Sequence, residues 1–323
     1  MTQVVTFQEL DCSNGKKIAI ATLNSPRSLN ALSGEMIDLL YPQLKTWQMQ
    51  TDIVAVFLQE EGDKAFCAGG DIVHMYKEMQ AHKGEFSPGI EEYFTKEYQL
   101  DYLIHTFDKP FIVWGNGIVM GGGLGMMVAG SHRVVTENSR IAMPEISIGL
   151  YPDVGGSYFL NAMPPGCGLF LGLTGASINA ADALYSNLAD YYMPQEAKQG
   201  LMDKLLGANW QVAEFAQTLS DICLEVQTDF HLALPKSNLK NYQDKLGALA
   251  HHVDVSQAVK FILALDSADD KWLSKAQKTL QAGSPITAHL VFEQLQRGKN
   301  MTLAECFQME LGMSCQCGEY GEF

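Results

Sequence analysis

The sequence has little positive charge, no long apolar run and no secretory signal, and each of these absences excludes a class of protein. Among 323 residues, 22 Lys and Arg stand against 37 Asp and Glu, which leaves a formal net charge of −15. Such a chain repels the phosphates of nucleic acids, so we expect no nucleic-acid partner. No stretch reaches the roughly 18 consecutive apolar residues of a membrane-spanning helix, so we expect no membrane association.

Cysteine is sparse and irregularly spaced, which indicates an intracellular protein. The seven cysteines are odd in number, and the close pair Cys315 and Cys317 has no second pair that would complete a zinc site. We therefore predict reduced, mostly buried thiols and no metal. Residues 1–6 lack the basic stretch and the apolar run of a secretory signal. The expected location is the bacterial cytoplasm or, for a eukaryotic source, the mitochondrial matrix, although we see no transit peptide.

Hydrophobic periodicity predicts an α/β fold for the first part of the chain. Two short strands, 3–9 and 17–23, flank a Ser-Asn-Gly turn and form a hairpin. A helix over 34–48 follows, and then a continuous apolar run, 53–58, of the kind found in strands that are buried on both faces of a parallel sheet. The alternation then continues with helices at 91–106 and near 121, and with strands at 110–114 and 133–136.

The second part of the chain has a different character. Long amphipathic stretches dominate it and no convincing strand is present, as at 195–206, 209–222 and 255–265. We therefore place a domain boundary near residue 200. Residues 1–200 are expected to form the α/β core and residues 201–323 a helical C-terminal region.

Paired glycines, Gly69 and Gly70, follow a short apolar run and precede an expected helix. A tight turn that needs a positive φ explains this pair by itself. The functional interpretation is that a backbone without side chains lets a ligand approach an N–H group closely. Both interpretations stay open on this segment alone.

Three consecutive glycines, Gly121 to Gly123, open an apolar helix directly after a strand. The free N–H groups and the positive dipole end of such a helix suit an anion or a developing oxyanion. A dinucleotide-binding fingerprint needs glycines at positions i, i+2 and i+5. Counted from Gly121 the last position is Met126, and counted from Gly123 it is Val128, so this fingerprint is excluded.

Two acidic residues eight positions apart, Glu145 and Asp153, lie in an apolar segment that ends in a Gly-Gly pair. Taken singly, Glu145 after Pro144 is typical of the first turn of a helix, and Asp153 is typical of a helix cap. A carboxyl group among apolar residues can also be activated by burial, which makes the pair a candidate site. The eight histidines are dispersed, and no catalytic triad can be argued from their spacing.

Taken together, these segments resemble the enoyl-CoA hydratase/isomerase (crotonase) superfamily. The similarity also covers Ser25 to Leu32, Leu173 to Gly175 and Leu188 to Asp190, so it runs through roughly the first 200 residues. The resemblance implies a crotonase-like spiral of repeated ββα units, followed by a helical C-terminal part. Within the superfamily, the motifs Phe-Cys-Ala-Gly-Gly-Asp, Met-Gly-Gly-Gly-Leu-Gly and Met-Pro-Glu…Tyr-Pro-Asp-Val-Gly-Gly are most similar to those of hydrolases of 3-hydroxyisobutyryl-CoA.

The resemblance also implies roles for individual residues. The backbone N–H groups of Gly70 and Gly122 would form an oxyanion hole for the thioester carbonyl. Glu145 would act as nucleophile or as general base, and Asp153 would orient the substrate hydroxyl or the attacking water. Contacts to the CoA-bearing substrate are expected from Arg27, Ala68 and Asp71, with Arg27 as the cation for the CoA phosphates.

One departure from the hydratases favours hydrolysis. Hydratases of this superfamily carry a glutamate where this chain has Gly125, so one acid/base partner for adding water to a double bond is missing. Glu145 matches the second hydratase glutamate, and Asp153 matches the additional acid of the hydrolases. We therefore expect hydrolysis of a short 3-hydroxyacyl-CoA thioester, with 3-hydroxyisobutyryl-CoA from valine breakdown as the first candidate.

Two alternatives stay open at this point: an enoyl-CoA isomerase that uses a single glutamate, and an inactive CoA-ester-binding protein. The expected partner is an acyl-CoA substrate, no metal or redox cofactor is implied, and a homo-oligomer is compatible with the resemblance. The superfamily branch normally continues past Gly318 to Phe323, and those extra residues help to close the active site. Whether the chain without them is active is therefore an open expectation.

Overall fold

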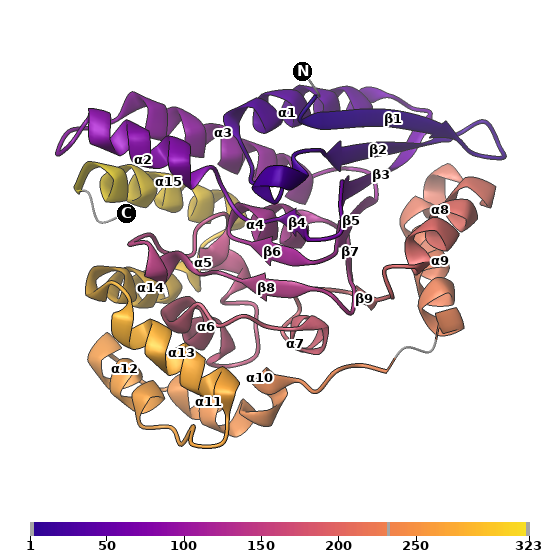
Figure 1. The fold of residues 1–323 in the computed structure, drawn as a ribbon. Coiled ribbons are helices and arrows are strands. Elements are labelled where there is room, and N and C mark those ends of the chain that lie inside the picture. The colour runs from indigo at the N-terminus through magenta and orange to yellow at the C-terminus, as the bar shows by residue number, and fades with distance from the viewer. Residues whose placement is uncertain (1–2, 231–232, 321–323) are drawn as a thin grey trace.

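Two sheets stand side by side at the centre of the molecule, and helices enclose them (Figure 1). The computed structural model describes residues 3–230 and 233–320. The larger sheet has the order β1-β2-β3-β5-β7-β9, in which only β1 and β2 are antiparallel. Its strands are β1 (Val5–Asp11), β2 (Lys17–Leu23), β3 (Ile53–Glu60), β5 (Phe111–Gly115), β7 (His132–Val135) and β9 (Tyr191–Tyr192).

The smaller sheet explains how the chain winds. It consists of three parallel strands of three residues each, β4 (Ala65–Cys67), β6 (Ile118–Met120) and β8 (Arg140–Ala142). Three successive turns of the chain, β3-β4, β5-β6 and β7-β8, each add one strand to the larger sheet and the next strand to the smaller sheet before the chain continues into helix. This is the spiral of ββα units that the resemblance implies.

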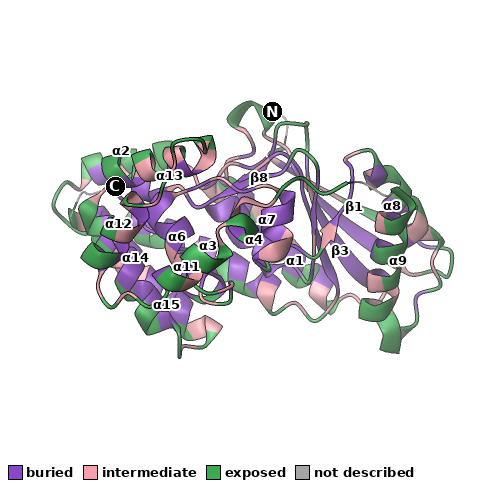
Figure 2. Ribbon diagram, turned by 90° about the horizontal axis from the view of Figure 1, so that it is seen from below, coloured by how far each residue is buried: buried purple, intermediate pink, exposed green. Residues whose placement is uncertain are grey.

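Strand β3 is buried on both faces, as its continuous apolar run predicts. Val56 and Leu58 point into a core shared with the helices α1 (Gly34–Met49) and α3 (Pro88–His105). Ala55 and Phe57 point into a second core, which α8 (Ala197–Gly207) and α9 (Phe215–Phe230) cover. Figure 2 shows β3 as buried, whereas the outward faces of α8 and α9 are exposed.

The other local predictions for the first part are confirmed with small shifts. The hairpin turns at Gly15, whose φ of +76° suits glycine. The glycine-rich segments lead into α2 (Ile72–Ala81) and α4 (Gly122–Ala129). Six of the seven cysteines are buried and Cys315 is half-buried.

Only helices and loops occur among the described residues beyond 200. After α5 (Gly156–Phe159), α6 (Cys167–Thr174) and α7 (Ala180–Tyr185) come α8 and α9, and then α10 (Asn238–Asn241), α11 (Gln243–Leu249), α12 (Val255–Leu263), α13 (Lys271–Ala282), α14 (Pro285–Gly298) and α15 (Leu303–Tyr320). The predicted helix over 209–222 instead begins at Phe215 and runs to Phe230.

The helices beyond 200 do not gather in one place. The predicted boundary at 200 falls inside α8, which packs on the larger sheet, whereas α15 packs along α3 on the opposite side (Figure 1). Within the described ranges, none of the helices combines the length and the apolar character that crossing a bilayer requires. Residues 1–2 and 321–323, which enter the expectations about the two chain ends, lie outside the described part.

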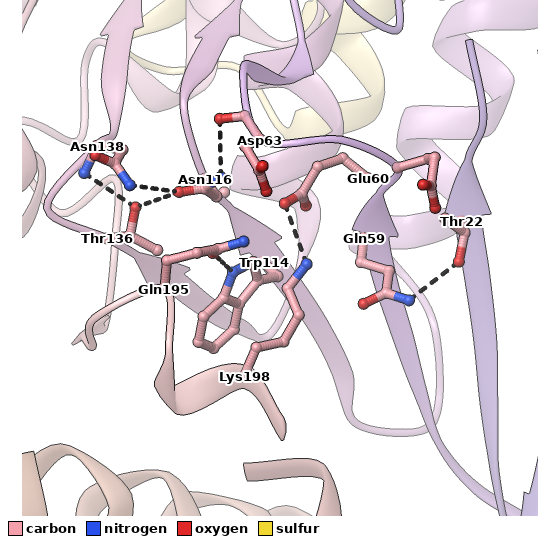
Figure 3. A network of polar contacts seen from close by, with 12 residues as sticks. Thr22, Gln59, Glu60, Asp63, Trp114, Asn116, Thr136, Asn138, Gln195 and Lys198 are labelled. Atoms are coloured by element: carbon pink, nitrogen blue, oxygen red, sulfur yellow. Dashed lines mark hydrogen bonds and ion pairs between the residues drawn. The ribbon is translucent and has the colours of Figure 1, made fainter. Parts of the chain in front are cut away.

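A polar network attaches α8 to the end of β3 (Figure 3). Lys198 Nζ lies 3.1 Å from Glu60 Oε1 and 5.6 Å from the centre of the Trp114 ring. The indole N–H of Trp114 donates to Gln195 Oε1 at 2.7 Å. Burial raises the pKa of Glu60 to about 7, and the positive charge of Lys198 opposes that rise. This buried carboxyl group therefore has a partner of opposite charge.

Candidate active site

A cavity of about 200 Å³ brings five of the predicted site residues together. It lies where β4 meets α2, where α4 begins, and where the chain crosses from β8 to α5. Its walls include Ala68, Gly70, Gly122, Glu145 and Asp153. Residues from three successive turns of the spiral therefore meet at one point.

Two unpaired backbone amides form one wall of this cavity. Within residues 3–230 and 233–320, neither the Gly70 N–H nor the Gly122 N–H donates a hydrogen bond. Gly122 is the first residue of α4, and a Cβ placed on it would lie 3.6 Å from the Gly70 nitrogen. Two neighbouring N–H groups without protein acceptors can hold a developing oxyanion.

Close packing explains why glycine occupies positions 122 and 125. A Cβ on Gly122 would collide with the carboxyl oxygen of Glu97. A Cβ on Gly125 would lie 2.6 Å from Val154 Cβ and 2.9 Å from Asp101 Oδ2. Position 125, where the resemblance places a glutamate in hydratases, therefore has no room for a side chain here.

Glu145 lies in the single 3₁₀ turn η2 (Glu145–Ser147) and is 5% exposed. The first helical turn expected at this point is thus present, but it does not continue into a longer helix. Glu145 Oε2 has no hydrogen-bond partner among the described residues, and Oε1 lies 2.9 Å from the position of a Cβ on Gly121. Burial, and then the charge of Asp153, raise the pKa of Glu145 well above its ordinary value.

Asp153 is also buried, and a phenol holds its side chain. The Tyr98 hydroxyl donates to Asp153 Oδ2 at 2.7 Å. Burial raises the pKa of Asp153 to about 6, while this hydrogen bond opposes the rise. The alternative that Asp153 is a helix cap is wrong, because the N-cap of α5 is Gly155.

Two further acids, Glu97 and Asp101, were missed by the sequence reasoning. They lie four residues apart on α3, so they share the face of that helix that is turned toward α4. Glu97 lines the cavity, and Asp101 has no hydrogen-bond partner for either carboxyl oxygen among the described residues. Burial and the neighbouring acids raise the pKa of both well above the usual range. The sequence did contain a signal for them, because both acids lie on a helical face whose other buried residues are apolar or aromatic.

No positive charge compensates this group of acids. Within the described ranges, no ion pair involves Glu97, Asp101, Glu145 or Asp153. His105 follows Asp101 by one helical turn, but burial lowers its pKa to about 4, so the ring stays neutral near pH 7. The acids of the cavity therefore keep their protons to higher pH than exposed acids do, which suits groups that exchange a proton during a reaction.

The remaining predicted residues, Arg27 and Asp71, lie outside the cavity. Arg27 is exposed and lines a separate hollow of about 360 Å³. The Asp71 carboxylate caps α2 by accepting the N–H of His74 at 3.0 Å. The loop of Arg27 adjoins the cavity wall, because the Ala68 N–H donates to the carbonyl of Leu29.

Comparison with known proteins identifies the class of this fold and site. A family model described as enoyl-CoA hydratase/isomerase matches residues 18–323, so the chain belongs to this family. A solved enoyl-CoA hydratase from Rhodobacter sphaeroides 2.4.1 shares the fold with a TM-score of 0.79 and 28% identity, over 97% of this chain and 85% of that chain. A carnitinyl-CoA dehydratase from Mycobacterium thermoresistibile gives 0.81 and 28%, over 97% and 86%. The crotonase-like fold expected from the motifs is confirmed.

Relatives in sequence point to one branch of the family. The mitochondrial 3-hydroxyisobutyryl-CoA hydrolase of Danio rerio is 35% identical over 302 residues, which cover 93% of this chain and 76% of that protein. The Homo sapiens protein of the same name is 32% identical, with 92% and 75% covered. The 3-hydroxyisobutyryl-CoA hydrolase 1 of Arabidopsis thaliana is 32% identical, with 92% and 77% covered. The similarity to this branch, inferred from the motifs, is confirmed.

Proposed function

We propose that this protein is a CoA thioester hydrolase that converts 3-hydroxyisobutyryl-CoA to 3-hydroxyisobutyrate and CoA. The observation that carries the proposal is that one cavity is lined both by Gly70 and Gly122, whose N–H groups donate no hydrogen bond among the described residues, and by the buried carboxyl groups of Glu145 and Asp153. The acyl group is taken from the names of the relatives in fish, mammals and plants.

The amides polarise the thioester. The carbonyl oxygen accepts hydrogen bonds from the N–H groups of Gly70 and Gly122, and these bonds strengthen as the carbon becomes tetrahedral and the oxygen becomes negative. Each donor of this kind contributes about 3–4 kcal/mol to stabilising the transition state. The donors belong to rigid backbone, so no reorganisation is needed during the reaction.

Glu145 supplies the attacking group in one of two ways. As a nucleophile, its carboxylate bonds to the thioester carbon, the C–S bond breaks, and the thiolate leaves as CoA after taking a proton. Water then hydrolyses the resulting anhydride. As a general base, Glu145 takes a proton from a water molecule that attacks the same carbon directly. The C–S bond then breaks, and the proton held by Glu145 passes to the leaving thiolate, which gives CoA and the free acid. Rapid quenching followed by peptide mass spectrometry distinguishes the routes, because only the first leaves an acyl group on Glu145.

Asp153 orients either the 3-hydroxyl of the substrate or the attacking water. Its side chain is held by the Tyr98 hydroxyl, and its negative charge raises the pKa of Glu145. Contacts to the rest of the CoA-bearing substrate are proposed for Arg27, Ala68 and Asp71. A cation at Arg27 favours the CoA phosphates on a chain whose net charge is −15.

This activity places the protein in valine degradation. The named vertebrate relatives are mitochondrial, and the proposed location is the mitochondrial matrix or, in a bacterium, the cytoplasm. The reaction is completed by the protein's own groups, so no metal or redox cofactor is proposed. A rate that is unchanged after treatment with EDTA tests this part.

A thiol-release assay over a panel of acyl-CoA esters tests the proposal. We expect free CoA from 3-hydroxyisobutyryl-CoA, and slower release from 3-hydroxypropionyl-CoA, because one methyl group is worth only about 1–3 kcal/mol in an apolar pocket. Migration of a double bond in an enoyl-CoA without thiol release would establish an isomerase instead. Tight binding with neither reaction would establish an inactive CoA-ester-binding protein.

A further inference from the structure

We propose that Glu310 of the C-terminal helix α15 is a positioning residue for Asp153, assisted by Ser314 on the same helix. The inference rests on the proposed function, because it concerns the carboxyl group that we place at the substrate hydroxyl or the water. Nothing in the glycine-rich or acidic motifs indicates it, since α15 lies about 150 residues further along the chain.

Glu310 holds the backbone that follows Asp153. Its side chain is fully buried, and its two carboxyl oxygens accept one N–H each. Oε2 accepts the N–H of Gly155 at 2.7 Å, and Oε1 accepts the N–H of Ser157 at 2.8 Å. Each carboxyl oxygen therefore serves as the acceptor for one of these two backbone N–H groups. Burial raises the pKa of Glu310 to about 8, and these bonds oppose the rise.

The backbone held in this way is in a conformation that needs support. Val154 has a φ of +50° and Gly155 a φ of +87°. A positive φ is unfavourable for a β-branched residue such as valine, and it persists only where surrounding contacts enforce it. Val154 is buried against Gly125, and the bonds to Glu310 begin at the next residue. Hydrogen bonds to Glu310 on α15 therefore stabilise the turn that follows Asp153.

The same helix also reaches the Asp153 side chain. The single hydroxyl hydrogen of Tyr98 is directed to Asp153 Oδ2, so the Ser314 hydroxyl, 2.7 Å from the Tyr98 oxygen, donates to Tyr98. The Tyr151 hydroxyl lies 2.8 Å from Ser314 Oγ and 2.7 Å from the carbonyl oxygen of Glu310. Glu310 therefore holds the backbone two and four residues after Asp153, and Ser314 reaches the Asp153 side chain through Tyr98.

A double-mutant cycle tests this link. The variants are Glu310→Gln, Asp153→Asn and the combination, each assayed for thiol release from 3-hydroxyisobutyryl-CoA. The amide of glutamine can accept only one of the two N–H bonds, so the turn is released without loss of side-chain volume. We expect Glu310→Gln to lower kcat/KM about tenfold when Asp153 is present, and less than twofold in the Asp153→Asn background.

A matched control is available on the same helix. Glu305 is exposed and caps the start of α15 by accepting the N–H of Thr302. Glu305→Gln makes the same side-chain substitution and weakens the start of the helix, but it does not touch the turn, so kcat/KM should stay within twofold of wild type. Equal losses from Glu310→Gln with and without Asp153, or a loss from Glu305→Gln as large as that from Glu310→Gln, would overturn the proposal.

Two further measurements keep the test decisive. If Glu310→Gln does not fold by circular dichroism, Ser314→Ala replaces it in the cycle, with an expected loss of about threefold that disappears in the Asp153→Asn background. If wild-type protein releases no thiol, the proposed function has failed. Crystal structures of wild type and Glu310→Gln then decide the positioning role: a moved turn at 153–155 supports it, and an unmoved turn refutes it.

Discussion

Glu60 and Glu145 are buried to the same degree, 4% and 5% exposed, but their surroundings differ in one respect. Glu60 has Lys198 at 3.1 Å, whereas Glu145 faces a cavity whose other ionisable groups are acids. An opposite charge limits the rise in pKa that burial causes, and a buried acid without such a partner keeps its proton to higher pH. Glu60 therefore links α8 to the end of β3, whereas Glu145 lies in the cavity and can take part in a reaction.

The same comparison explains how a strongly acidic site is tolerated. Burial and the neighbouring acids raise the pKa of Glu97, Asp101 and Glu145 well above the ordinary range, so these groups keep their protons to higher pH than exposed acids do, which reduces their mutual repulsion. Asp153, with a pKa of about 6, is the acid in the cavity that ionises first, because Tyr98 donates to it. Buried acids with a raised pKa can transfer protons during a reaction, but their burial lowers the stability of the folded protein.

The largest expected effect separates the two glutamates directly. Glu145→Gln should lower kcat by a factor of about 10²–10⁴, because an amide is neither a base nor a competent nucleophile. The fold and the binding of the CoA ester should be retained. Thiol release and calorimetric binding of the substrate measure the two quantities.

The matched substitution is Glu60→Gln, which should leave kcat within twofold of wild type. If Glu145→Gln retained more than about a tenth of wild-type kcat, Glu145 would not be the essential group. If Glu60→Gln were as inactive as Glu145→Gln, the distinction between a structural role for Glu60 and a catalytic role for Glu145 would be wrong.

The second effect concerns the amide wall of the cavity. Gly122→Pro removes one N–H at the first position of α4, where proline suits the helical backbone. Gly122→Ala keeps the N–H but brings the same Cβ against Glu97. We expect the proline variant to be about 10²–10³-fold slower in kcat than the alanine variant. Circular dichroism checks the fold of both, and equal rates of the two folded variants would exclude this amide from the oxyanion hole.

The third effect assigns the role of Asp153. If Asp153 accepts a hydrogen bond from the 3-hydroxyl, Asp153→Asn should reduce kcat/KM for the hydroxylated ester about 10- to 150-fold more than for isobutyryl-CoA. If it orients the water, both esters should lose the same factor through kcat. Near-wild-type rates on both esters would remove Asp153 from the mechanism.

The same variant should also move the pH profile. Glu145 must lose its proton to react, so kcat/KM should rise with pH. Asp153→Asn removes a neighbouring negative charge that raises the pKa of Glu145. The rising limb should therefore shift to lower pH, by about one to two units. A limb that stays in place would show that the two carboxyl groups do not interact electrostatically.

The smallest expected effect is on the free energy of unfolding, and it concerns Glu60. The pKa of Glu60 is raised from 4.5 to about 7 on folding, so the folded state binds more protons between these values. Its contribution to the free energy of unfolding is present below about pH 4.5 and is lost as the pH rises toward 7, by at most about 1.4 kcal/mol per pH unit. Urea titrations from pH 4.5 to 8 should show a shallower fall for Glu60→Gln than for wild type. The exposed neighbour variant Glu61→Gln serves as control and should follow wild type.

Much of the site could be predicted because its residues lie in short contiguous segments. Gly70, Gly122, Glu145 and Asp153 each occur beside a turn or helix start whose chemistry is visible in the sequence, and the cavity contains all four. Arg27 and Asp71 occur in equally clear segments, but the structure places them outside that cavity. Local pattern shows which residues are unusual, but it does not show which of them meet.

The sequence by itself determined most strands of the larger sheet, several of the helices and the two glycine-rich turns, because these depend on periodicity and on backbone freedom within a few residues. Only the tertiary structure decided the partners of the buried carboxyl groups. Glu60 meets Lys198, which lies 138 residues further on. Tyr98, 55 residues before Asp153, donates to its side chain, and Glu310 accepts the N–H of Gly155, which lies 155 residues before it. The charges beside a buried carboxyl group decide whether its role is structural or catalytic, and those charges depend on which distant segments of the chain pack together.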